Sequence, residues 1–336
     1  MKHSNNPSSA NDLEISVVIP TLNEEDSIRR LLEDVLGQTL KPAEIVITDG
    51  GSIDQTREII EEFITAGAPV RLIRTTKSMP GRARNLAVAA SRGKWIAFTD
   101  AGITLMPDWL EALTSTAHNS SADVVYGTYE PIINSFFTEC SAIAYVPPPF
   151  HSDGGPVRPR SIVSALMRRR AWETVGGFPE DLRSAEDLLF MNRVEQAGFT
   201  IARTSQAKVY WQIQPNLWRT FKRFVEYSRN NIRAGLFNEW QRTIFLYYAL
   251  VAATVFSVIL LGVSGLIVPV LAWLLILMAR ATKTLYQNRQ AYPAGFARNV
   301  LRLVLLFPII ATLDAAAFVG FANWLLRDQL RLIKSK

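Results

Sequence analysis

The first part of the chain alternates short apolar runs with segments of helical periodicity. The apolar runs are rich in β-branched residues and too short for helices, so they predict buried strands. They occupy residues 15–20, 44–48, 70–74, 95–99 and 122–127. Helical patterns fill the intervals between these runs. Strands that alternate with helices in this way predict a doubly wound, mainly parallel α/β sheet.

Polar residues follow three of the predicted strands at the points where the strands end. A turn containing Pro20, Thr21, Asn23 and Glu24 follows the first strand, Asp49 the second and Asp100 the fourth. In open α/β sheets, ligands bind beyond the carboxyl ends of the strands, so we expect these side chains to converge on one rim. A single aspartate there can simply cap a loop, but three clusters in register favour a binding site.

Several function classes lack their sequence signatures. The chain contains neither G-x-G-x-x-G nor G-x-x-x-x-G-K-[ST], which argues against a dinucleotide dehydrogenase and a P-loop NTPase. Its one cysteine, Cys140, excludes an intramolecular disulfide and a site built from several thiolates. The net charge is +6, with basic residues beside the apolar segments. This placement predicts anionic lipid headgroups, not nucleic acid, as the partner.

The second part of the chain contains long apolar segments. Residues 243–279 carry no charge, and as one helix they would be about 55 Å long against a bilayer core of about 30 Å. They therefore predict two short spans with a turn near 262–265. A third segment, 303–326, contains Asp314 and Pro308. Basic residues flank the hairpin on both sides and also follow the third segment, which favours a hairpin open to the cytoplasm and an interfacial or re-entrant third segment.

These patterns divide the chain into five parts. A disordered polar tail is expected first, then an α/β domain, a basic amphipathic juxtamembrane helix, a transmembrane hairpin, and a basic linker with the third membrane-associated segment. Their expected ranges are 1–13, 14–215, 216–242, 243–281 and 282–336. Within the second part, residues 145–160 are rich in proline and glycine and are expected to form a long loop.

Three blocks of sequence resemble family-2 glycosyltransferases of the GT-A fold. The first runs from ISVVIPTLNEE to ITDGGSIDQT, the second is GRARNLAVAASRGKWIAFTDAGITLMPDWLE, and the third is GGFPEDLRSAEDLLFMNRVEQAGF. They follow the family's order over about residues 14–200. The resemblance implies a GT-A sheet and an inverting enzyme that uses a nucleotide-sugar donor.

The resemblance also implies roles for individual residues. Asp187 matches the general base, and its neighbour Glu186 lies on the acceptor side together with Gly177 and Phe178. Asp100 matches the first acid of the family's D-x-D motif. The donor-binding residues implied are Pro20, Thr21, Asn23, Glu24, Asp49, Arg82, Asn85 and Asp100.

The sequence departs from the family at the implied metal site. The resemblance implies Mg²⁺ or Mn²⁺ on Asp100, but the second D-x-D acid is replaced by Gly102, and Gly50 replaces a further family acid. Where the family often has a histidine after the late strand, this chain has Tyr210 or Trp211. A cation could supply the missing charge instead. The candidates are Arg158, Arg160 and Arg183.

The favoured function is a membrane-anchored inverting glycosyltransferase of cell-envelope polysaccharide synthesis, with its catalytic domain in the cytoplasm. The acceptor is a hydroxyl or a phosphate, and a lipid-linked acceptor is one option. The Q-x-x-R-W signature of processive synthases is absent; Arg219 and Arg223 lie in that region and either bind phosphate or flank the membrane segment. The alternatives are a catalytically weak nucleotide-sugar-binding scaffold of a membrane glycan assembly and a nucleotidyltransferase.

Overall fold

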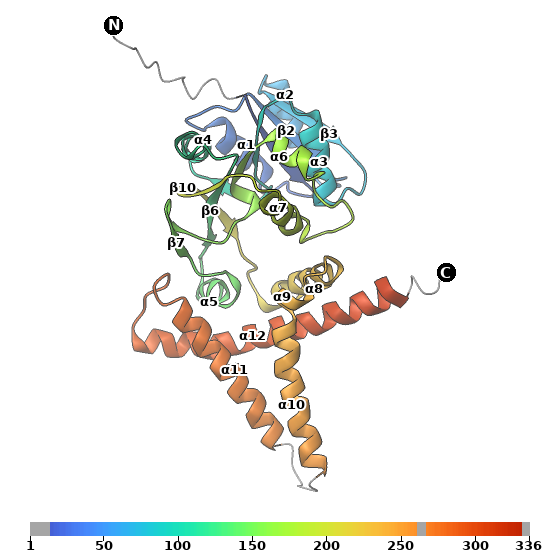
Figure 1. Cartoon of the computed structure of the whole chain (residues 1–336), viewed down its shortest axis with the longest axis vertical. Helices are drawn as coiled ribbons and strands as arrows, with labels where there is room; N and C mark the ends of the chain where they lie inside the picture. The colour runs from blue at the N-terminus through green and yellow to red at the C-terminus, as the bar shows by residue number, and fades with distance from the viewer. Residues whose placement is uncertain (1–13, 261–266, 331–336) are drawn as a thin grey trace. The chain divides into compact units, whose positions relative to one another are not determined.

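The computed structural model describes residues 14–260 and 267–330, which form two compact units. One unit contains residues 14–131 and 149–212, and the other contains 132–148 and the described residues from 213 onward (Figure 1). The segment 132–148 therefore leaves the first unit, folds with the second and returns.

The first unit is built on an eight-stranded sheet with the strand order β3-β2-β1-β4-β9-β6-β10-β5. The first four strands in this order pair in parallel. Their bounds are β1 Ile15–Thr21, β2 Glu44–Asp49, β3 Val70–Arg74 and β4 Trp95–Phe98. The strands predicted at 15–20, 44–48, 70–74 and 95–99 are thus confirmed, and so is their parallel arrangement.

The other half of the sheet begins at β9, which pairs antiparallel with both β4 and β6, and ends with β5, antiparallel to β10. The strand predicted at 122–127 is the start of β6. The bounds are β5 Ile103–Leu105, β6 Val124–Ile132, β9 Ala165–Arg168 and β10 Ile201–Gln212. The prediction of one long loop over 145–160 was wrong in part, because β7 (Phe150–Ser152) and β8 (Gly155–Val157) pair there as a hairpin.

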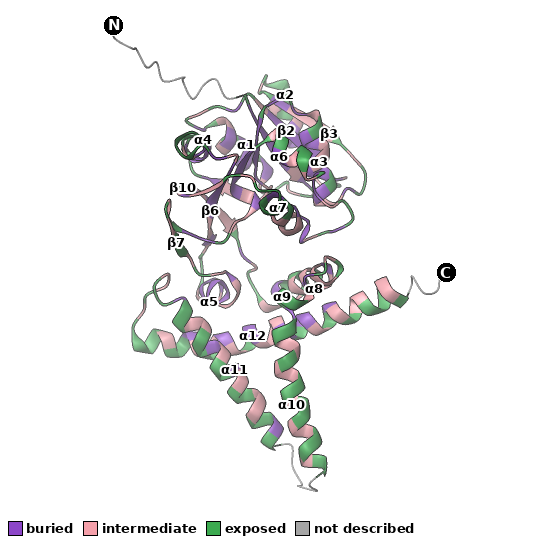
Figure 2. Ribbon diagram, viewed as in Figure 1, coloured by how far each residue is buried: buried purple, intermediate pink, exposed green. Residues whose placement is uncertain are grey.

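Helices cover both faces of this sheet, and alternate strand residues face different apolar clusters. Val17 and Ile19 belong to the cluster that contains residues of α1, α2 and α4, whereas Val18 belongs to the cluster that contains residues of α3, α6 and α7. Burial on both faces explains why the central strands are continuously apolar, and β1, β2 and β4 are almost wholly buried (Figure 2). The helices are α1 Ile28–Leu36, α2 Thr56–Thr65, α3 Pro80–Ala90, α4 Trp109–Ser120, α6 Arg169–Thr174 and α7 Glu186–Gln196. A 3₁₀ turn, Ile162–Ser164, precedes β9.

The second unit is helical. The juxtamembrane helix predicted at 216–242 is divided in two, because Gly235 adopts a positive φ of 77° between α8 and α9. Helix α8 packs closely on α12: Ser228 Oγ donates to the Ala317 carbonyl at 2.9 Å, and a Cβ on Gly320 would lie 2.5 Å from Ser228 Cβ. The elements are α5 Phe136–Tyr145, α8 Leu217–Arg233, α9 Phe237–Trp240, α10 Arg242–Leu260, α11 Ile267–Gln287 and α12 Phe296–Trp324, which continues as a π-helical turn, Leu325–Gln329.

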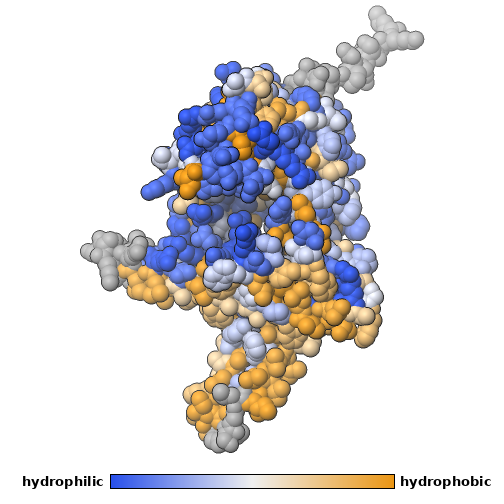
Figure 3. Space-filling model, turned by 180° about the vertical axis from the view of Figure 1, so that it is seen from behind, coloured by the Kyte–Doolittle hydropathy of each residue, from blue (hydrophilic) through white to orange (hydrophobic). Residues whose placement is uncertain are grey.

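Three helical segments of this unit are long and apolar enough to cross a membrane: α10, α11 and residues 296–329. The first two coincide with the predicted hairpin, whose expected turn at 262–265 lies outside the described residues. The outer surfaces of α10 and α11 are exposed, and hydrophobic side chains dominate that part of the surface (Figures 2 and 3). Within this unit α12 lies across the ends of α10 and α11 instead of running alongside them (Figure 1).

The two buried acidic side chains among the described residues of the helical unit are paired with arginines. Asp314, fully buried in the middle of α12, receives both Nη atoms of Arg280, one at 2.8 Å, and the Tyr248 hydroxyl at 3.3 Å. Glu139 of α5 pairs with Arg298 and Arg302 of α12. These contacts neutralise the charge inside the third apolar segment and attach α5 to α12.

Candidate active site

The three polar strand ends lie side by side, as the sequence predicts. Strand β1 lies between β2 and β4 and is parallel to both, so the turn after Thr21 is flanked by Asp49 on one side and Asp100 on the other. Hydrogen bonds join the first two: Asn23 N donates to Ser52 Oγ at 2.8 Å, and Ile53 N donates to Asn23 Oδ1 at 2.9 Å.

Asp49 is fully buried and holds its own loop. Its carboxylate accepts from the backbone N–H groups of Gly51 and Ser52 at 3.2 Å and pairs with Arg57 Nε at 3.1 Å. Arg57 and Arg82 both line a hollow of about 550 Å³ that also contains Thr75 and Thr76. Two predicted donor-binding residues are therefore linked through Arg57 at a polar, positively charged cavity.

Replacing Asp49 tests this part of the site. Asp49→Asn keeps the shape and an acceptor but removes the charge that pairs with Arg57, and we expect a loss of about 1–3 kcal/mol of stability. We also expect nucleotide affinity to fall about tenfold, because Arg57 is no longer fixed beside the cavity. Thermal unfolding and nucleotide titration of the full chain in detergent measure both effects. The exposed Glu58→Gln on the same helix as Arg57 serves as the control and should change neither.

A buried arginine connects the donor side of the rim to the acidic pair. Arg84 Nη2 donates to both oxygens of Asp100, at 2.7 and 2.9 Å, and its Nη1 donates to Glu186 Oε1 at 2.7 Å. The Arg84 side chain is only 4% exposed, whereas Asp100 is 29% exposed. Asp187 is next in the chain to Glu186 and partly exposed, and its charge also acts on Arg84. Asp100 and the adjacent pair Glu186 and Asp187, which lie far from Asp100 in the sequence, thus act on one guanidinium.

This arrangement shifts the acid–base behaviour of the pair. Burial, together with the neighbouring charge of Asp187, raises the pKa of Glu186 to about 7 despite the opposing effect of Arg84. Burial raises the pKa of Asp187 as well, and the charge of Asp100 adds to that rise while Arg84 opposes it. The Arg84 pKa is raised by the surrounding carboxylates against the effect of its own burial, so the guanidinium stays charged. Carboxylates whose pKa values lie near neutrality are typical of general bases.

The backbone brings α3 and the acidic helix together at a glycine. A Cβ on Gly81 would lie 2.0 Å from the Pro179 carbonyl oxygen, so a larger residue would push the two segments apart. One turn further along α3, Asn85 accepts from Trp172 Nε1 at 3.0 Å and from Phe178 N at 2.9 Å, and its Nδ2 donates to the Phe178 carbonyl at 2.9 Å.

Asn85, Gly177 and Phe178 lie together in the structure. The contacts they make there position the turn before α7 and the side chains around Arg84. Asn85 uses its amide on the turn before α7, and Gly177 adopts a positive φ of 74° directly over Asn85. Phe178 is buried, stacks on Phe190 and lies 5.4 Å below the Arg84 guanidinium. Direct contacts of these residues with donor or acceptor stay predictions.

Two of the three arginines suggested as replacements for a metal charge pair with carboxylates other than Asp100, Glu186 and Asp187. Arg158 is buried and pairs with Glu130 at 2.6 Å, and Arg160 pairs with Glu195 at 2.9 Å. Arg183 is exposed. The cation within the acidic cluster is Arg84, which the sequence reasoning missed. The helical spacing places Arg84 on the same buried face as Ala87 and Val88. Because a buried charge requires a partner, this position could have identified Arg84 as a site residue.

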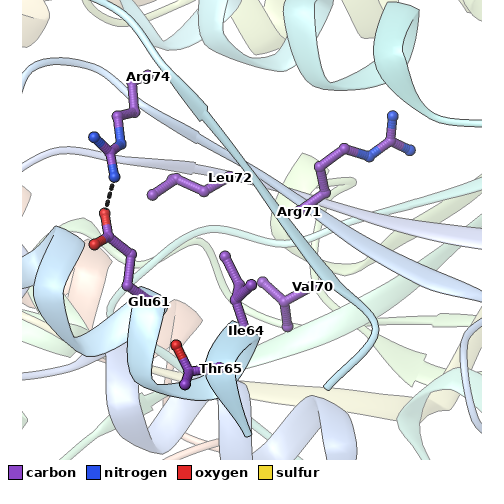
Figure 4. Close-up of a pocket in the computed structure, with 7 residues that line it drawn as sticks. All are labelled: Glu61, Ile64, Thr65, Val70, Arg71, Leu72 and Arg74. Carbon is purple, nitrogen blue, oxygen red and sulfur yellow. Dashed lines mark hydrogen bonds and ion pairs between the residues drawn. The ribbon is translucent and has the colours of Figure 1, made fainter. Parts of the chain in front are cut away.

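Polar atoms without a protein partner gather around the same rim. The Thr21 and Thr99 hydroxyls, Arg84 Nε and Glu186 Oε2 are buried and make no hydrogen bond within the described chain. Most buried polar atoms in proteins are paired, so such a group of unpaired atoms indicates a place where water or a ligand completes the structure. By contrast, a second hollow, of about 450 Å³ between α2 and the edge strand β3, contains none of the predicted site residues (Figure 4).

The implied metal has a single predicted ligand. Among residues 14–260 and 267–330, no group of three or more His, Cys, Asp or Glu side chains is arranged to hold a metal ion. Gly102 has a positive φ of 81° and brings no carboxylate. Trp211, which with Tyr210 is one of the two candidates for the position of the family histidine, packs against the apolar cluster on one face of the sheet. Asp100 still offers lone pairs, because each carboxylate oxygen accepts more than one bond.

Comparison with known proteins identifies the family. The family model described as Glycosyl transferase family 2 matches residues 16–176. The succinoglycan biosynthesis protein ExoA of Rhizobium meliloti (strain 1021) is 30% identical over 229 residues, which cover 65% of this chain and 68% of that protein. The chain belongs to glycosyl transferase family 2. Glycosyltransferase AglE of Haloferax volcanii is 29% identical over 191 residues, covering 56% of this glycosyltransferase and 63% of the relative.

Solved structures show the same fold. TarS 1-349 of S. aureus, determined in complex with UDP-GlcNAc, has a TM-score of 0.51 and 16% identity over 93% of this chain and 92% of its own. Mannosyltransferase PcManGT of Pyrobaculum calidifontis, in complex with GDP-Man and Mn²⁺, has a TM-score of 0.55 and 15% identity over 94% and 88%. The predicted GT-A fold of this family-2 glycosyltransferase is therefore confirmed.

Proposed function

We propose that this glycosyltransferase is tethered to the cytoplasmic membrane and transfers a sugar, with inversion, from a nucleotide-sugar to a hydroxyl or phosphate acceptor. The observation that carries the proposal is the single guanidinium of Arg84, bound to Asp100 on the donor side and to Glu186 on the side of the base. A proposed donor-binding residue and a neighbour of the proposed base therefore belong to one cluster of side chains.

The donor is a nucleotide-sugar bound at the carboxyl ends of β1, β2 and β4. The residues proposed to hold its nucleoside are those of the turn after β1 together with Asp49, and Arg82 faces the adjoining positively charged hollow. Structural neighbours with the same fold were determined with UDP-GlcNAc and with GDP-Man, which supports this class of donor.

Asp187 is the proposed general base. Asp187 is partly exposed and is proposed to reach an acceptor hydroxyl, and Leu188 N–H donates to its Oδ1 at 2.8 Å and fixes its orientation. Its raised pKa strengthens it as a proton acceptor. Attack by the deprotonating acceptor on the face opposite the leaving diphosphate inverts the anomeric carbon in one displacement.

A divalent cation, Mg²⁺ or Mn²⁺, fits this donor set. Asp100 presents hard oxygen ligands at the rim, and Mg²⁺ is commonly held by one or two carboxylates together with substrate phosphates and waters. When bound, the ion supplies positive charge for the diphosphate leaving group. Arg84 holds Asp100 in one orientation from the protein side.

The helical unit supports the proposed placement at a membrane. The helices α10 and α11 are the proposed spanning hairpin, with basic residues on both flanks facing the cytoplasm. Because α12 lies across their ends and its buried Asp314 is paired, we propose an interfacial position for α12. This placement suits a membrane lipid or lipid-linked acceptor.

Donor screening followed by turnover tests the proposal. The detergent-solubilised full chain is melted in the presence of nucleotide-sugars, since a bound donor raises the melting temperature. Hits are then assayed for nucleoside diphosphate release with and without EDTA. We expect stabilisation by at least one donor class and release of nucleoside diphosphate; release of pyrophosphate would indicate a nucleotidyltransferase.

A catalytically weak nucleotide-sugar-binding scaffold is the second candidate. It is favoured by Gly102 at the second D-x-D position and by Tyr210 or Trp211 at the histidine position. Donor binding without hydrolysis or transfer, under all acceptor conditions, would support the scaffold and rule out the enzyme.

The pH dependence of transfer reports on the acidic pair. Because the Glu186 pKa is raised to about 7 and the Asp187 pKa is also raised, the pair is partly protonated below neutrality and a protonated base cannot accept the acceptor's proton. We expect kcat/KM to rise with pH to a plateau, with an inflection near pH 7. In Glu186→Gln one carboxylate charge is removed, so the inflection should move to lower pH. A profile with no inflection between pH 5 and 8 would contradict this assignment.

A further inference from the structure

The turn after β1 reaches the place where the second acid of a D-x-D motif would lie. A Cβ built on Gly102 would lie 3.6 Å from Glu24 Oε2, which is an ordinary van der Waals distance. Glu24 belongs to the loop after β1 and Gly102 to the loop after β4, and these two strands are neighbours in the sheet. An existing carboxylate oxygen thus lies against the rim position where the second D-x-D acid is missing.

The position of Glu24 is fixed by hydrogen bonds. Its backbone N–H donates to Thr56 Oγ1 at 2.7 Å, and its Oε2 accepts from Ser27 Oγ at 2.5 Å. The side chain is partly exposed, so it can meet a ligand at the rim. These contacts orient the Glu24 carboxylate before any ligand binds.

Two further features at the rim agree with a carboxylate from β1. Gly102 has a positive φ, which glycine adopts most readily, and it leaves the turn after β4 without a second carboxylate. The buried hydroxyls of Thr21 and Thr99, at the ends of the same two strands, have no protein partner within the described chain.

We propose that Glu24 replaces the missing second acid, so that Glu24 and Asp100 together hold the divalent cation against the donor diphosphate. The inference rests on the proposed function, because it assigns a ligand within that donor site. Two carboxylates from separate strands, completed by phosphate oxygens and water, form a ligand set that suits Mg²⁺ or Mn²⁺. The two carboxylate ligands then come from the loops after β1 and β4 instead of from one D-x-D turn.

Manganese binding tests the proposal directly. The full chain in detergent is titrated with Mn²⁺, alone and with saturating UDP or GDP, and free Mn²⁺ is followed by electron paramagnetic resonance. We expect nucleotide to tighten Mn²⁺ binding in the wild type. Glu24→Gln should weaken it at least tenfold, although the new amide oxygen can still accept from Ser27. The exposed Asp26→Asn loses the same charge two residues away and should bind Mn²⁺ as the wild type does.

A relocated carboxylate provides the positive test. The double variant Glu24→Gln with Gly102→Asp returns the acid to β4, and since aspartate tolerates positive φ better than most residues, we expect it to recover at least part of the Mn²⁺ affinity. Thermal unfolding identifies variants that fail to fold; if the double variant fails, Glu24→Asp takes its place and should bind more tightly than Glu24→Gln.

The outcomes separate this inference from the proposed function. Wild-type Mn²⁺ affinity in Glu24→Gln, with a loss in Asp100→Asn, shows that Glu24 is not a ligand. Absence of nucleotide-dependent Mn²⁺ binding in the wild type overturns the inference too, yet the proposed transferase stands if EDTA-treated protein still turns over donor. Failure of the proposed function is a different result: no nucleotide-sugar then raises the melting temperature.

Discussion

Asp187→Asn should lower kcat for sugar transfer about 1,000-fold and leave donor affinity nearly unchanged. General-base removal typically costs about 10²- to 10⁴-fold, because the attacking hydroxyl must then lose its proton to water. Asparagine has the same shape, and its amide oxygen still accepts from Leu188 N–H, as Asp187 does at 2.8 Å. The measurement combines initial rates at saturating donor with donor titration by thermal shift or calorimetry.

The matched control is Asp108→Asn, an exposed aspartate ahead of α4 that makes no side-chain capping bond. It should keep wild-type kcat and donor affinity. If Asp187→Asn retained more than a tenth of the wild-type rate, the base would have to be another group. A parallel loss of rate and donor affinity would instead indicate that Asp187 helps to build the donor site.

Local patterns were sufficient to predict the parallel half of the sheet and its rim. The runs that form β1, β2 and β4 are apolar on both faces, and the polar residue that follows each one marks its carboxyl end. Parallel pairing then places Asp49 and Asp100 on either side of the β1 turn without further information. For this reason the sequence was sufficient to predict that these three strand ends lie side by side.

The contacts that complete the site could not be predicted in the same way. Arg84 meets Asp100 across 16 positions and Glu186 across 102, and a periodic pattern on one helix identifies a buried charge but not its partners. Strand β9 was missed because its four residues, ALMR, run directly into the basic helix α6. The approach of Glu24 to Gly102 depends on how two loops close over neighbouring strands.

The segment 128–160 shows the same limit on a larger scale. Helix α5 has little local periodicity that reveals its surroundings, and its Glu139 is paired with Arg298 and Arg302, about 160 positions away. Ile143 of α5 packs into an apolar cluster with Leu277 and Leu306 of the helical unit. Helix α5 belongs to the second unit because of its contacts with residues that are distant in the sequence. The residues around α5 in the sequence do not reveal those contacts.

Arg84→Met should destabilise the protein by about 3–5 kcal/mol and abolish measurable transfer. Removing one partner of a buried ion pair leaves uncompensated charge in a poorly solvated place, which costs about that much. Here the Arg84 guanidinium forms ion pairs with both Asp100 and Glu186, and its charge also offsets that of Asp187. Methionine preserves most of the side-chain volume, so the loss reports on charge. Arg82→Met, exposed two residues earlier on α3, is the control for stability and should change it by about 0.5 kcal/mol at most.

The pH dependence of this loss has a definite sign. Glu186 has a folded-state pKa near 7, above its ordinary 4.5, so its contribution to stability is complete below about pH 4.5 and is lost as pH rises through 7. Without Arg84 the folded-state pKa values of Glu186 and Asp187 rise further, and ionising them costs more. The difference in melting temperature between wild type and Arg84→Met should therefore be larger at pH 8 than at pH 5.5. Adding Glu186→Gln to Arg84→Met removes one of the unpaired acids and should recover part of the stability at pH 8. An equal loss at both pH values, with no recovery in the double variant, would mean that Arg84 acts through packing against Phe178 and not as the cation that holds the acidic cluster together.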